Sequence, residues 1–476
     1  MSPETPAMLD YLVRQRWFAG DGPGWELVDL DAYGWLDGAP EGLRVRYEIV
    51  TVDGPGGRQT YNLPTAYRSE PIEANAYGLI GTSRDEDGRE EFVYDALHDP
   101  QARQVLMAGF FTDARVGGIR YATEPSFHAT DGDSDEPSEP IGPDSESVLL
   151  AVEQSNTSMI VDEVAMLKVF RKVVLGRNPD VEIHDALAGP GDDAIAALWG
   201  WVCTDTQPGE GYDLAMLQRF LRTATSGWDS ARASVRDLLA EPDLAPQEAG
   251  GDFAGEAERL GEAVALVHTL MAQRLTTASW GAEELAALAD RLTARMDALV
   301  ARVEALAPYA DAARAVYDQL RTPDGSALAQ RVHGDLHLGQ TLRTTAGWKL
   351  IDFEGEPAAP LAERTALDSP LRDIAGMLRS FDYAARSSLL QSVAADGDEV
   401  ARAEAWARRN RGAFLRGYAS GRAADAAEPA SSAELTDTLM RAYEIDKALY
   451  EYVYEIDHRP DWVAVPATAL DRLLER

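Results

Sequence analysis

Cysteine is almost missing from this chain, and so is any long run of apolar residues. The 476 residues contain one cysteine, Cys203, which excludes an internal disulfide framework and is typical of a reducing compartment. No apolar stretch approaches the length of a membrane-spanning helix, and the opening MSPET lacks the basic and apolar regions of a signal peptide. We therefore expect a cytoplasmic protein that does not bind a membrane.

Basic residues are scarce relative to acidic ones. The sequence holds 44 Lys and Arg against 80 Asp and Glu, a formal net charge of −36. Nucleic acids and anionic membranes repel such a surface, so neither is expected as a partner. The charge fits a cationic substrate or simple solubility. Hydrophobic residues still make up 45% of the chain, which supports large cores, and the length predicts two or three subdomains.

The strongest chemical signal is the stretch QRVHGDLHLGQ at 330–340 together with IDFEG at 351–355. Asp335 follows an apolar strand start, Gln340 comes five residues later, and Asp352 ends a second apolar strand. Kinase catalytic loops have a base Asp, a metal-binding amide five residues on, and a metal-binding Asp on a following strand. Phosphoryl transfer needs a carboxylate on the attacking hydroxyl and oxygen ligands for Mg²⁺. We predict Asp335 as the base, and Asp352 and Gln340, where Asn is usual, as Mg²⁺ ligands.

Two neighbouring residues are expected to support this loop rather than to react. His333 precedes the predicted base, and phosphoryl transfer does not need a second base, so its role is structural. Asp373 opens a helix in RDIAGMLRS at 372–380. An acid in this position can accept backbone N–H groups and brace the catalytic loop, although a simple charge at a helix N-terminus would look the same.

The N-terminal part of the chain predicts a β-rich module. A short amphipathic helix within residues 1–20 ends at Gly20, and a helix is expected near 99–110. Alternating segments separated by Gly- and Pro-bearing turns predict strands at 43–52, 60–66 and 91–94. We assign residues 1–112 to this module. The acidic Ser-, Pro- and Gly-rich residues 128–147 have little to bury and predict a mobile loop.

Residues 113–221 predict a β-rich subdomain that binds ATP. Strands are expected at 148–152, 159–161, 165–170 and 215–221. Lys168 lies between apolar neighbours on the third strand, as a phosphate-pairing lysine must, and Glu182 of a following helix is its expected partner. The turn between the first two strands would hold phosphates through small polar residues in place of glycines, and the backbone of 218–221, at the end of the last strand, would bind adenine. The predicted ATP-binding residues are Lys168, Ser155, Asn156, Thr157, Ser158, Glu182, Gln218, Phe220 and Leu221.

Residues 222–476 predict a helical lobe that contains the catalytic loop. Helices are expected at 229–239, 252–275 and 283–320 by periodicity, and another at 442–464. On this last helix, aromatic and charged residues recur at three- and four-residue steps opposite Leu449, Val453 and Ile456, which suits a sugar; a solvated, salt-bridged face would show the same pattern. The predicted acceptor-binding residues are Asp335, His337, Glu354, Asp446, Lys447, Tyr450, Glu451, Tyr454, Glu455, Asp457 and Trp462.

Nearly the whole chain resembles the maltokinase-like sugar kinases, which share the aminoglycoside-phosphotransferase, protein-kinase-like fold. The matching segments are RQRWFAG at 14–20, YDALHDP at 94–100, EQSNTS at 153–158, LKVFR at 167–171, QRVHGDLHLGQ at 330–340, IDFEGEP at 351–357, RDIAGMLRSFDYA at 372–384 and the helix from 447 to 462. The resemblance implies a bilobal α+β fold with an N-terminal β-rich cap. It also implies transfer of the ATP γ-phosphate to a sugar with Mg²⁺, with Lys168 on the phosphates.

Three positions depart from the usual maltokinase pattern. Asp21 stands where lysine usually follows RWFAG, and Ser226 stands where a residue such as Asp usually precedes Gly-Trp. Ile456-Asp457-His458 replaces Ala-Arg-Asn or Ala-Arg-His, which puts an anion where a cation is usual. The sequence therefore looks more like the glucosamine-kinase branch, whose acceptor carries an ammonium. Asp457 is the predicted partner of that ammonium, with Glu451, Glu455 and Asp446 as alternates.

Other functions stay open at this point. The first expectation is a monomeric kinase that makes glucosamine 6-phosphate, and the runner-up is a maltokinase that makes maltose 1-phosphate. A catalytically weak sugar-binding module is a third possibility, because Gln340 and the phosphate turn without glycine depart from common kinases. Aminoglycoside phosphorylation would use the same fold.

Overall fold

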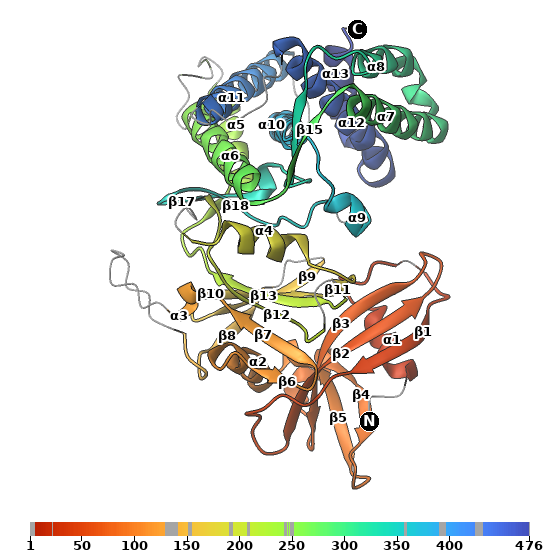
Figure 1. Cartoon of the computed structure of the whole chain (residues 1–476), viewed down its shortest axis with the longest axis vertical. Helices are drawn as coiled ribbons and strands as arrows, with labels where there is room; N and C mark the ends of the chain where they lie inside the picture. The colour runs from red at the N-terminus through yellow and green to blue at the C-terminus, as the bar shows by residue number, and fades with distance from the viewer. Residues whose placement is uncertain are drawn as a thin grey trace. The chain divides into compact units, whose positions relative to one another are not determined.

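The structure, a computed structural model, describes residues 5–20, 22–128, 141–150, 155–189, 194–206, 210–241, 245, 247, 252–356, 359–389, 397–423 and 432–475. The chain divides into two compact units, Met1–Gly189 with Ala196–Arg222, and Pro190–Ile195 with Thr223–Arg476. Strands dominate the first unit and helices the second (Figure 1), which is the α+β class predicted from the sequence. Of the described helices, none combines the length and apolar character needed to cross a bilayer.

The first unit contains two antiparallel sheets (Figure 1). One has the order β1-β2-β3-β5-β4, with β11 added on β3, and the other has the order β6-β7-β12-β13-β10-β9-β8. The strands are β1 Glu26–Ala32, β2 Leu43–Asp53, β3 Gln59–Arg68, β4 Leu79–Arg84, β5 Glu90–Asp95, β6 Arg115–Val116, β7 Ile119–Thr123, β8 Ser147–Leu149, β9 Asn156–Val161, β10 Ala165–Phe170, β11 Lys172–Val173, β12 Leu198–Thr204 and β13 Asp213–Arg219. The helices are α1 Thr5–Leu12, α2 Pro100–Ala108, α3 Pro125–His128 and α4 Pro179–Leu187.

Buried polar contacts join these two sheets where β10 runs into β11. Arg171 lies between the two strands and is fully buried, and its Nη2 donates to Asp95 Oδ2 at 2.7 Å at the end of β5. The Asn62 amide on β3 donates to the carbonyls of Phe170 and Leu214, each at 3.0 Å. Apolar residues from both sheets share one buried cluster. The two segments treated as separate subdomains in the sequence analysis therefore form one compact unit.

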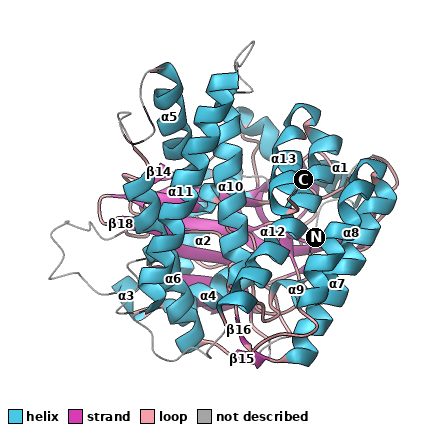
Figure 2. Cartoon of the chain, turned by 90° about the horizontal axis from the view of Figure 1, so that it is seen from above, coloured by secondary structure: helices cyan, strands magenta, loops and turns pink. Residues whose placement is uncertain are grey.

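The second unit is built of helices with two small sheets. The helices are α5 Gly227–Ala240, α6 Ala254–Arg274, α7 Ala282–Arg302, α8 Ala307–Gln319, α9 Leu361–Arg364, α10 Leu371–Leu389, α11 Gly397–Ala423, α12 Ala433–His458 and α13 Ala464–Leu473. Strands β14 Thr225–Ser226, β17 Thr341–Thr344 and β18 Gly347–Leu350 form one sheet, and β15 Thr277–Trp280 pairs with β16 Ala327–Gln330. Figure 2 shows α10 between α11 and α12, and α10 packs on both.

Several sequence predictions of element bounds need correction. Strand β8 ends at Leu149, and residues 151–154 of the predicted strand and turn lie outside the described residues. Residues 156–158 of that turn belong to strand β9, since they pair with β10. Most of the acidic loop at 128–147 also lies outside the described residues, as does Asp21. Helix α12 is longer than predicted at its N-terminus, and Ile456, expected on its packed side, is exposed.

Helices α6 and α11 approach each other closely because glycines line their contact. A Cβ on Gly417 of α11 would overlap the Glu258 carbonyl, and one on Gly261 of α6 would overlap the Phe414 carbonyl. A larger residue at either glycine must push the two backbones apart. This contact therefore fixes the spacing of the helix pair.

We expect Gly417→Ala to lower the free energy of unfolding by about 1–3 kcal/mol through overpacking. Gly412→Ala on the same helix is the matched control, because its Cβ would meet its nearest heavy atom at 3.7 Å. The control should instead gain up to about 1 kcal/mol from helix propensity. Denaturant unfolding of both variants measures the difference, and equal stability would contradict this account of the packing.

Candidate active site

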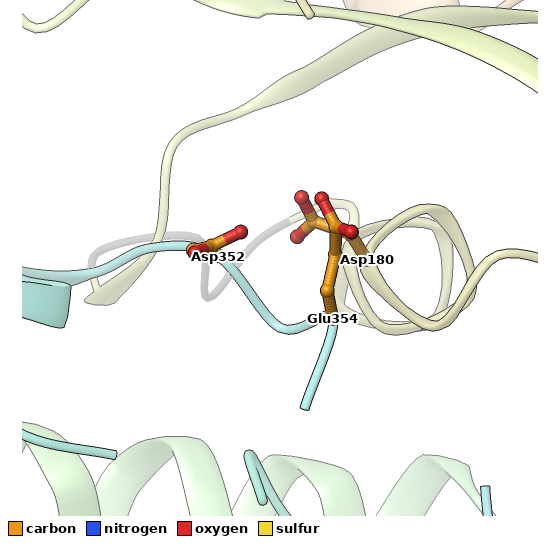
Figure 3. A group of neighbouring side chains, drawn as sticks. All are labelled: Asp180, Asp352 and Glu354. Carbon is orange, nitrogen blue, oxygen red and sulfur yellow. The ribbon is translucent and has the colours of Figure 1, made fainter. Parts of the chain in front are cut away.

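The catalytic loop lies between β16 and the β17–β18 hairpin of the second unit. Pairing of β17 with β18 places Ile351 opposite Gln340, and the Ile351 N–H donates to the Gln340 carbonyl at 3.1 Å. Asp352 follows with a φ of +67°, in the left-handed region of the backbone. The Gln340 amide donates to Asp352 Oδ2 at 2.8 Å. The hairpin thus brings the two predicted Mg²⁺ ligands together. Glu354 leaves the same loop as Asp352 (Figure 3).

Helix α10 holds the start of this loop through Asp373. The buried Asp373 carboxylate accepts from the backbone N–H groups of His333 and Gly334, at 2.7 and 2.9 Å. His268 of α6 lies 3.0 Å from Asp373 Oδ2 through its Nε2. Burial raises the pKa of Asp373, but these donors outweigh it and hold the pKa below its usual value. These are the bracing contacts that the sequence analysis expected of Asp373.

Both histidines of the loop are engaged in internal contacts. His333 Nε2 donates to the Ile351 carbonyl at 3.0 Å, and its ring packs on Phe353 with 4.8 Å between centroids. His337 Nδ1 accepts from the Gly339 N–H at 3.0 Å, and burial lowers the pKa of His337. His333 therefore has the structural place predicted for it. His337 was predicted to bind the acceptor, but it is not among the residues that line the cavity described next.

Asp335 lines a small cavity of about 40 Å³ inside the second unit. Lys447 Nζ lies 3.3 Å from Asp335 Oδ1 and 3.7 Å from Glu356 Oε2. The Tyr450 hydroxyl donates to Glu356 Oε1 at 3.3 Å. The lining residues are Arg295, Gly334, Asp335, Leu336, Glu356, Arg372, Asp373, Gly376, Tyr443, Asp446, Lys447 and Tyr450. Helix α12 therefore faces the predicted base, as the sequence suggested.

Asp446 is the unusual residue of this cavity. It is 8% exposed, its Oδ2 lies 3.2 Å from Arg295 Nη1, and its buried Oδ1 has no hydrogen-bond partner among the described residues. Burial raises the pKa of the Asp446 carboxyl despite Arg295 nearby. A buried carboxylate oxygen without a donor is costly, so this atom would gain from a ligand that donates a hydrogen bond.

The other acidic residues predicted on α12 do not line the cavity. Asp457 pairs with Arg302 at 2.5 Å, and its side chain is 32% exposed. Glu451 accepts from the buried Arg379 at 2.8 Å, and Glu455 accepts from Tyr383 at 2.9 Å and from Arg459. Asp457, predicted to bind the acceptor ammonium, is therefore not among the residues that line this cavity.

The aromatic residues near the end of α12 also lie outside the cavity. Tyr454 stacks on His458 with 4.3 Å between centroids and is exposed. Trp462 stacks on Tyr383 at 5.9 Å. These rings pack on neighbouring side chains of the helix end. Of the predicted acceptor-binding residues of this helix, Asp446, Lys447 and Tyr450 line the cavity.

In the first unit, Lys168 pairs with Asp180, whereas the sequence predicted Glu182 as its partner. Lys168 Nζ donates to Asp180 Oδ2 at 2.8 Å, and both side chains are buried. Asp180 lies on the first turn of α4 (Figure 3), and its Oδ1 is 3.1 Å from Nδ1 of His184 one turn later. Burial raises the pKa of Asp180, but Lys168 and His184 outweigh it and hold the pKa well below its usual range. The Asn178-Pro179 start, a cap followed by a helix-opening proline, could have placed Asp180 in this turn.

The remaining predicted ATP-binding residues lie on β9 and β13 or beside them. Thr157 accepts from Arg171 Nε at 2.8 Å, and Asn156 and Ser158 are buried in strand β9; Ser155 precedes that strand. Gln218 is buried within β13. The Phe220 N–H donates to the Val164 carbonyl at 2.7 Å, and Leu221 follows it. Residues 156–158 therefore lie on a strand, whereas the sequence predicted that they belong to a polar tight turn.

Comparison with known proteins places this site in a family. The maltokinase N-terminal cap domain matches residues 11–99, and the phosphotransferase enzyme family matches residues 242–424. A glucosamine kinase of Streptacidiphilus jiangxiensis is 31% identical over 336 residues, which cover 68% of this chain and 73% of that protein. A glucosamine kinase of Mycolicibacterium smegmatis (strain ATCC 700084 / mc(2)155) is 26% identical over 335 residues, 68% of this chain and 79% of that protein.

The chain belongs to the glucosamine kinase family of maltokinase-like sugar kinases. A solved structure of a glucosamine kinase in complex with glucosamine, ADP and inorganic phosphate matches 100% of both chains, with a TM-score of 0.69 and 23% identity. The predicted phosphotransferase fold with its N-terminal cap is thus confirmed. Glu356 and Arg295, which line the cavity of this family member, were not predicted as site residues, since Arg295 comes from a distant helix.

The Lys168–Asp180 pair leads to a test that separates the two candidate carboxylates. We expect Asp180→Asn to lower kcat/KM for ATP roughly 10- to 100-fold, because a hydrogen bond to a charged group is worth about 1.5–3 kcal/mol. Glu182→Gln is the matched control on the same helix and should change kcat/KM for ATP less than about twofold. Steady-state kinetics with ATP varied decides between them; a larger loss in Glu182→Gln would restore the sequence prediction.

The depressed pKa of Asp373 predicts how the loop responds to acid. Its stabilising effect is present above the unfolded-state pKa, near 3.9, and is lost as pH falls through the lower folded-state pKa. We expect Asp373→Asn to lower the free energy of unfolding at pH 7 by about 1.5–3 kcal/mol. The gap between the variant and the natural protein should narrow below about pH 4. Denaturant unfolding at pH 7, 5 and 3 measures this gap, and a gap that stays constant would exclude Asp373 as the source.

Proposed function

We propose that this protein transfers the γ-phosphate of ATP to glucosamine and forms glucosamine 6-phosphate. The observation that carries this proposal is the carboxylate of Asp446, a residue that lines the cavity together with Asp335 and whose buried Oδ1 has no hydrogen-bond partner among the described residues. The family relatives named glucosamine kinase support it. Glucosamine carries an ammonium near neutral pH, and glucose and maltose do not.

The chemistry assigned to Asp335 is that of the base. Its carboxylate lines the cavity, where it can accept a hydrogen bond from the acceptor hydroxyl and take the proton as the phosphoryl group transfers. Lys447 Nζ donates a hydrogen bond to this carboxylate at 3.3 Å, which orients the two side chains relative to each other. In the first unit, Lys168 is assigned to the ATP phosphates, with Asp180 orienting its ammonium.

Gln340 and Asp352 are the residues assigned to Mg²⁺. Their carboxylate and amide oxygens are the hard ligands that this ion prefers, and the 2.8 Å hydrogen bond from the Gln340 amide nitrogen to Asp352 Oδ2 keeps the two side chains together. When bound, the ion neutralises charge on the transferring phosphates. The extra carbon of Gln relative to Asn lets this amide reach Asp352 across the hairpin.

The selectivity for an ammonium is assigned to Asp446. A charge-assisted hydrogen bond from the glucosamine ammonium to Oδ1 would be worth roughly 1.5–3 kcal/mol, or about 10- to 100-fold in preference over a hydroxyl analogue. The cation would also compensate the burial that raises the pKa of Asp446. With the ammonium at C2 held there, the primary hydroxyl at C6 is the acceptor assigned to Asp335.

A panel of acceptors tests the function. We expect glucosamine to give the highest kcat/KM among glucosamine, N-acetylglucosamine, glucose, maltose and kanamycin in an ADP-release assay, and Asp335→Ala to abolish turnover, since a general base contributes about 10²–10⁴-fold. Asp446→Asn should lower the glucosamine-to-glucose ratio roughly 10- to 100-fold. Asp457→Asn, on the same helix but paired with Arg302, is the matched control and should leave that ratio within about twofold.

The outcomes separate the candidate functions. Maltose as the best acceptor would instead support the maltokinase function suggested by the cap-domain match at residues 11–99. Kanamycin as the best acceptor would indicate aminoglycoside phosphorylation. If no sugar released ADP, the protein would not be a sugar kinase. An unchanged ratio in Asp446→Asn would leave glucosamine kinase activity standing but remove Asp446 from ammonium recognition.

A further inference from the structure

One stripe of helix α10 holds the catalytic loop. Asp373 accepts the two N–H groups at the start of the loop. One turn later, Gly376 lies so close that a Cβ there would come within 2.6 Å of the Leu336 carbonyl. After one more turn, Ser380 Oγ accepts from the Leu338 N–H at 3.0 Å. The spacing of three and four residues puts these contacts on one side of the helix.

A second stripe of the same helix holds α12. Arg379 is fully buried, and its Nε donates to Glu451 Oε2 at 2.8 Å while its Nη1 donates to Asp382 Oδ2 at 2.7 Å. Four residues later, Tyr383 donates to Glu455 Oε1 at 2.9 Å. A guanidinium holds two carboxylates in fixed directions, and a buried charge pair has a narrow range of favourable geometry. These contacts therefore fix the rotation of α12 about its own axis.

The residue that Arg379 holds lies beside the cavity face of α12. Glu451 comes directly after Tyr450 and one turn after Lys447, and these two residues line the cavity with Asp335. In the part of the chain that the structure describes, Arg379 is the only ion-pair partner of Glu451 within 4 Å. Without Arg379, a buried carboxylate would lose its counter-charge and α12 could turn to expose it.

We propose that Arg379 is a positioning residue for the reaction: by holding Glu451, it keeps Lys447 and Tyr450 of α12 over Asp335 of the catalytic loop. This inference rests on the proposed sugar kinase activity. Arg379 does not line the cavity, so its effect passes through Glu451. Arg379 is also next to Ser380, which holds the catalytic loop. Neighbouring residues of α10 therefore hold the loop and α12.

The surrounding charges allow a clean experiment. Asp382 also contacts Arg411 of α11 and Arg472 of α13, at 3.3 and 2.9 Å, so it keeps counter-charges when Arg379 is replaced. Glu451 would keep only the weaker electrostatic effect of Lys447, because Arg379 is its one ion-pair partner within 4 Å among the described residues. Arg379→Met keeps much of the volume and removes this ion pair. Adding Glu451→Gln removes the charge of the carboxylate, so the double variant should regain stability lost in Arg379→Met.

The experiment measures thermal stability and steady-state kinetics for Arg379→Met, Glu451→Gln and the double variant. We expect KM for glucosamine to rise or kcat to fall roughly 10- to 100-fold in all three, because a misplacement of about 1 Å costs that much. KM for ATP should stay within about twofold. The double variant should regain melting temperature without regaining activity. Its fold-loss in kinetics should equal that of either single variant and not the product of the two losses, because both substitutions break the same contact.

Arg302→Gln is the control, because it removes an ion pair to α12 at Asp457 that lies on the surface. It should change neither KM. Activity that returns together with stability in the double variant would show a merely structural role and overturn the inference. So would single variants that fold and keep the acceptor kinetics of the natural protein. If Arg379→Met does not fold, Glu451→Gln decides alone, because Gln has nearly the same shape as Glu. Unchanged kinetics with glucosamine in this variant would overturn the inference.

The natural protein in the same assay separates this inference from the proposed function. If the natural protein releases ADP in response to glucosamine and the variants have the same KM and kcat for glucosamine, only the positioning role is overturned. No such release by the natural protein would overturn the proposed function, and the positioning role with it.

Discussion

The hydrogen bonds accepted by Asp373 are the constraint on which the catalytic unit depends. Taking a carboxylate out of water costs several kcal/mol, and here the cost is offset by two backbone N–H groups of the loop and by His268. The donors belong to the catalytic loop and to α6, while the acceptor belongs to α10. Satisfying one buried charge therefore fixes the loop relative to two helices, and Asp335 follows the clamped residues directly.

Other polar residues along helix α10 also hold neighbouring elements in place. Its apolar residues, such as Ile374 and Phe381, are buried among the neighbouring helices, while polar residues on two stripes hold the loop and α12. Arg379, Asp382 and their partners on α11, α12 and α13 form a buried network in which acids and arginines alternate. Such networks add little net stability compared with apolar packing, but they allow few alternative arrangements. A site that needs side chains from distant helices gains from that restriction.

Most of the buried acids discussed above are compensated within the fold, and one is compensated only in part. Asp95 has Arg171, Asp180 has Lys168, and Glu451 has Arg379, so each burial cost is met inside the fold. Asp446 retains an oxygen that no described residue satisfies. Since nearly all buried polar atoms in proteins find partners, an unpartnered oxygen on a residue that lines a cavity points to a ligand. For a chain of net charge −36, a cationic ligand is the natural complement.

The sequence by itself determined the catalytic loop, because its parts are local. The five-residue step from Asp335 to Gln340 and the short hairpin to Asp352 set those positions almost without help from the rest of the chain. The existence of the helices and the β-rich cap also followed from periodicity and turn residues. Asp373 could be anticipated, since an acid opening a helix has few roles.

The tertiary structure alone decided which acids meet their partners. Asp180 and Glu182 are two residues apart on α4 and so point to opposite sides of the helix, and only the packing of α4 shows which side meets Lys168. Asp446 and Asp457 are eleven residues apart, about three turns, so periodicity places them on one side of α12. They differ by about 16 Å along its axis. Which of the two acids lies beside the catalytic loop depends on the position of α12 along α10. Contacts such as Arg379–Glu451, between residues seventy-two apart in sequence, set that position.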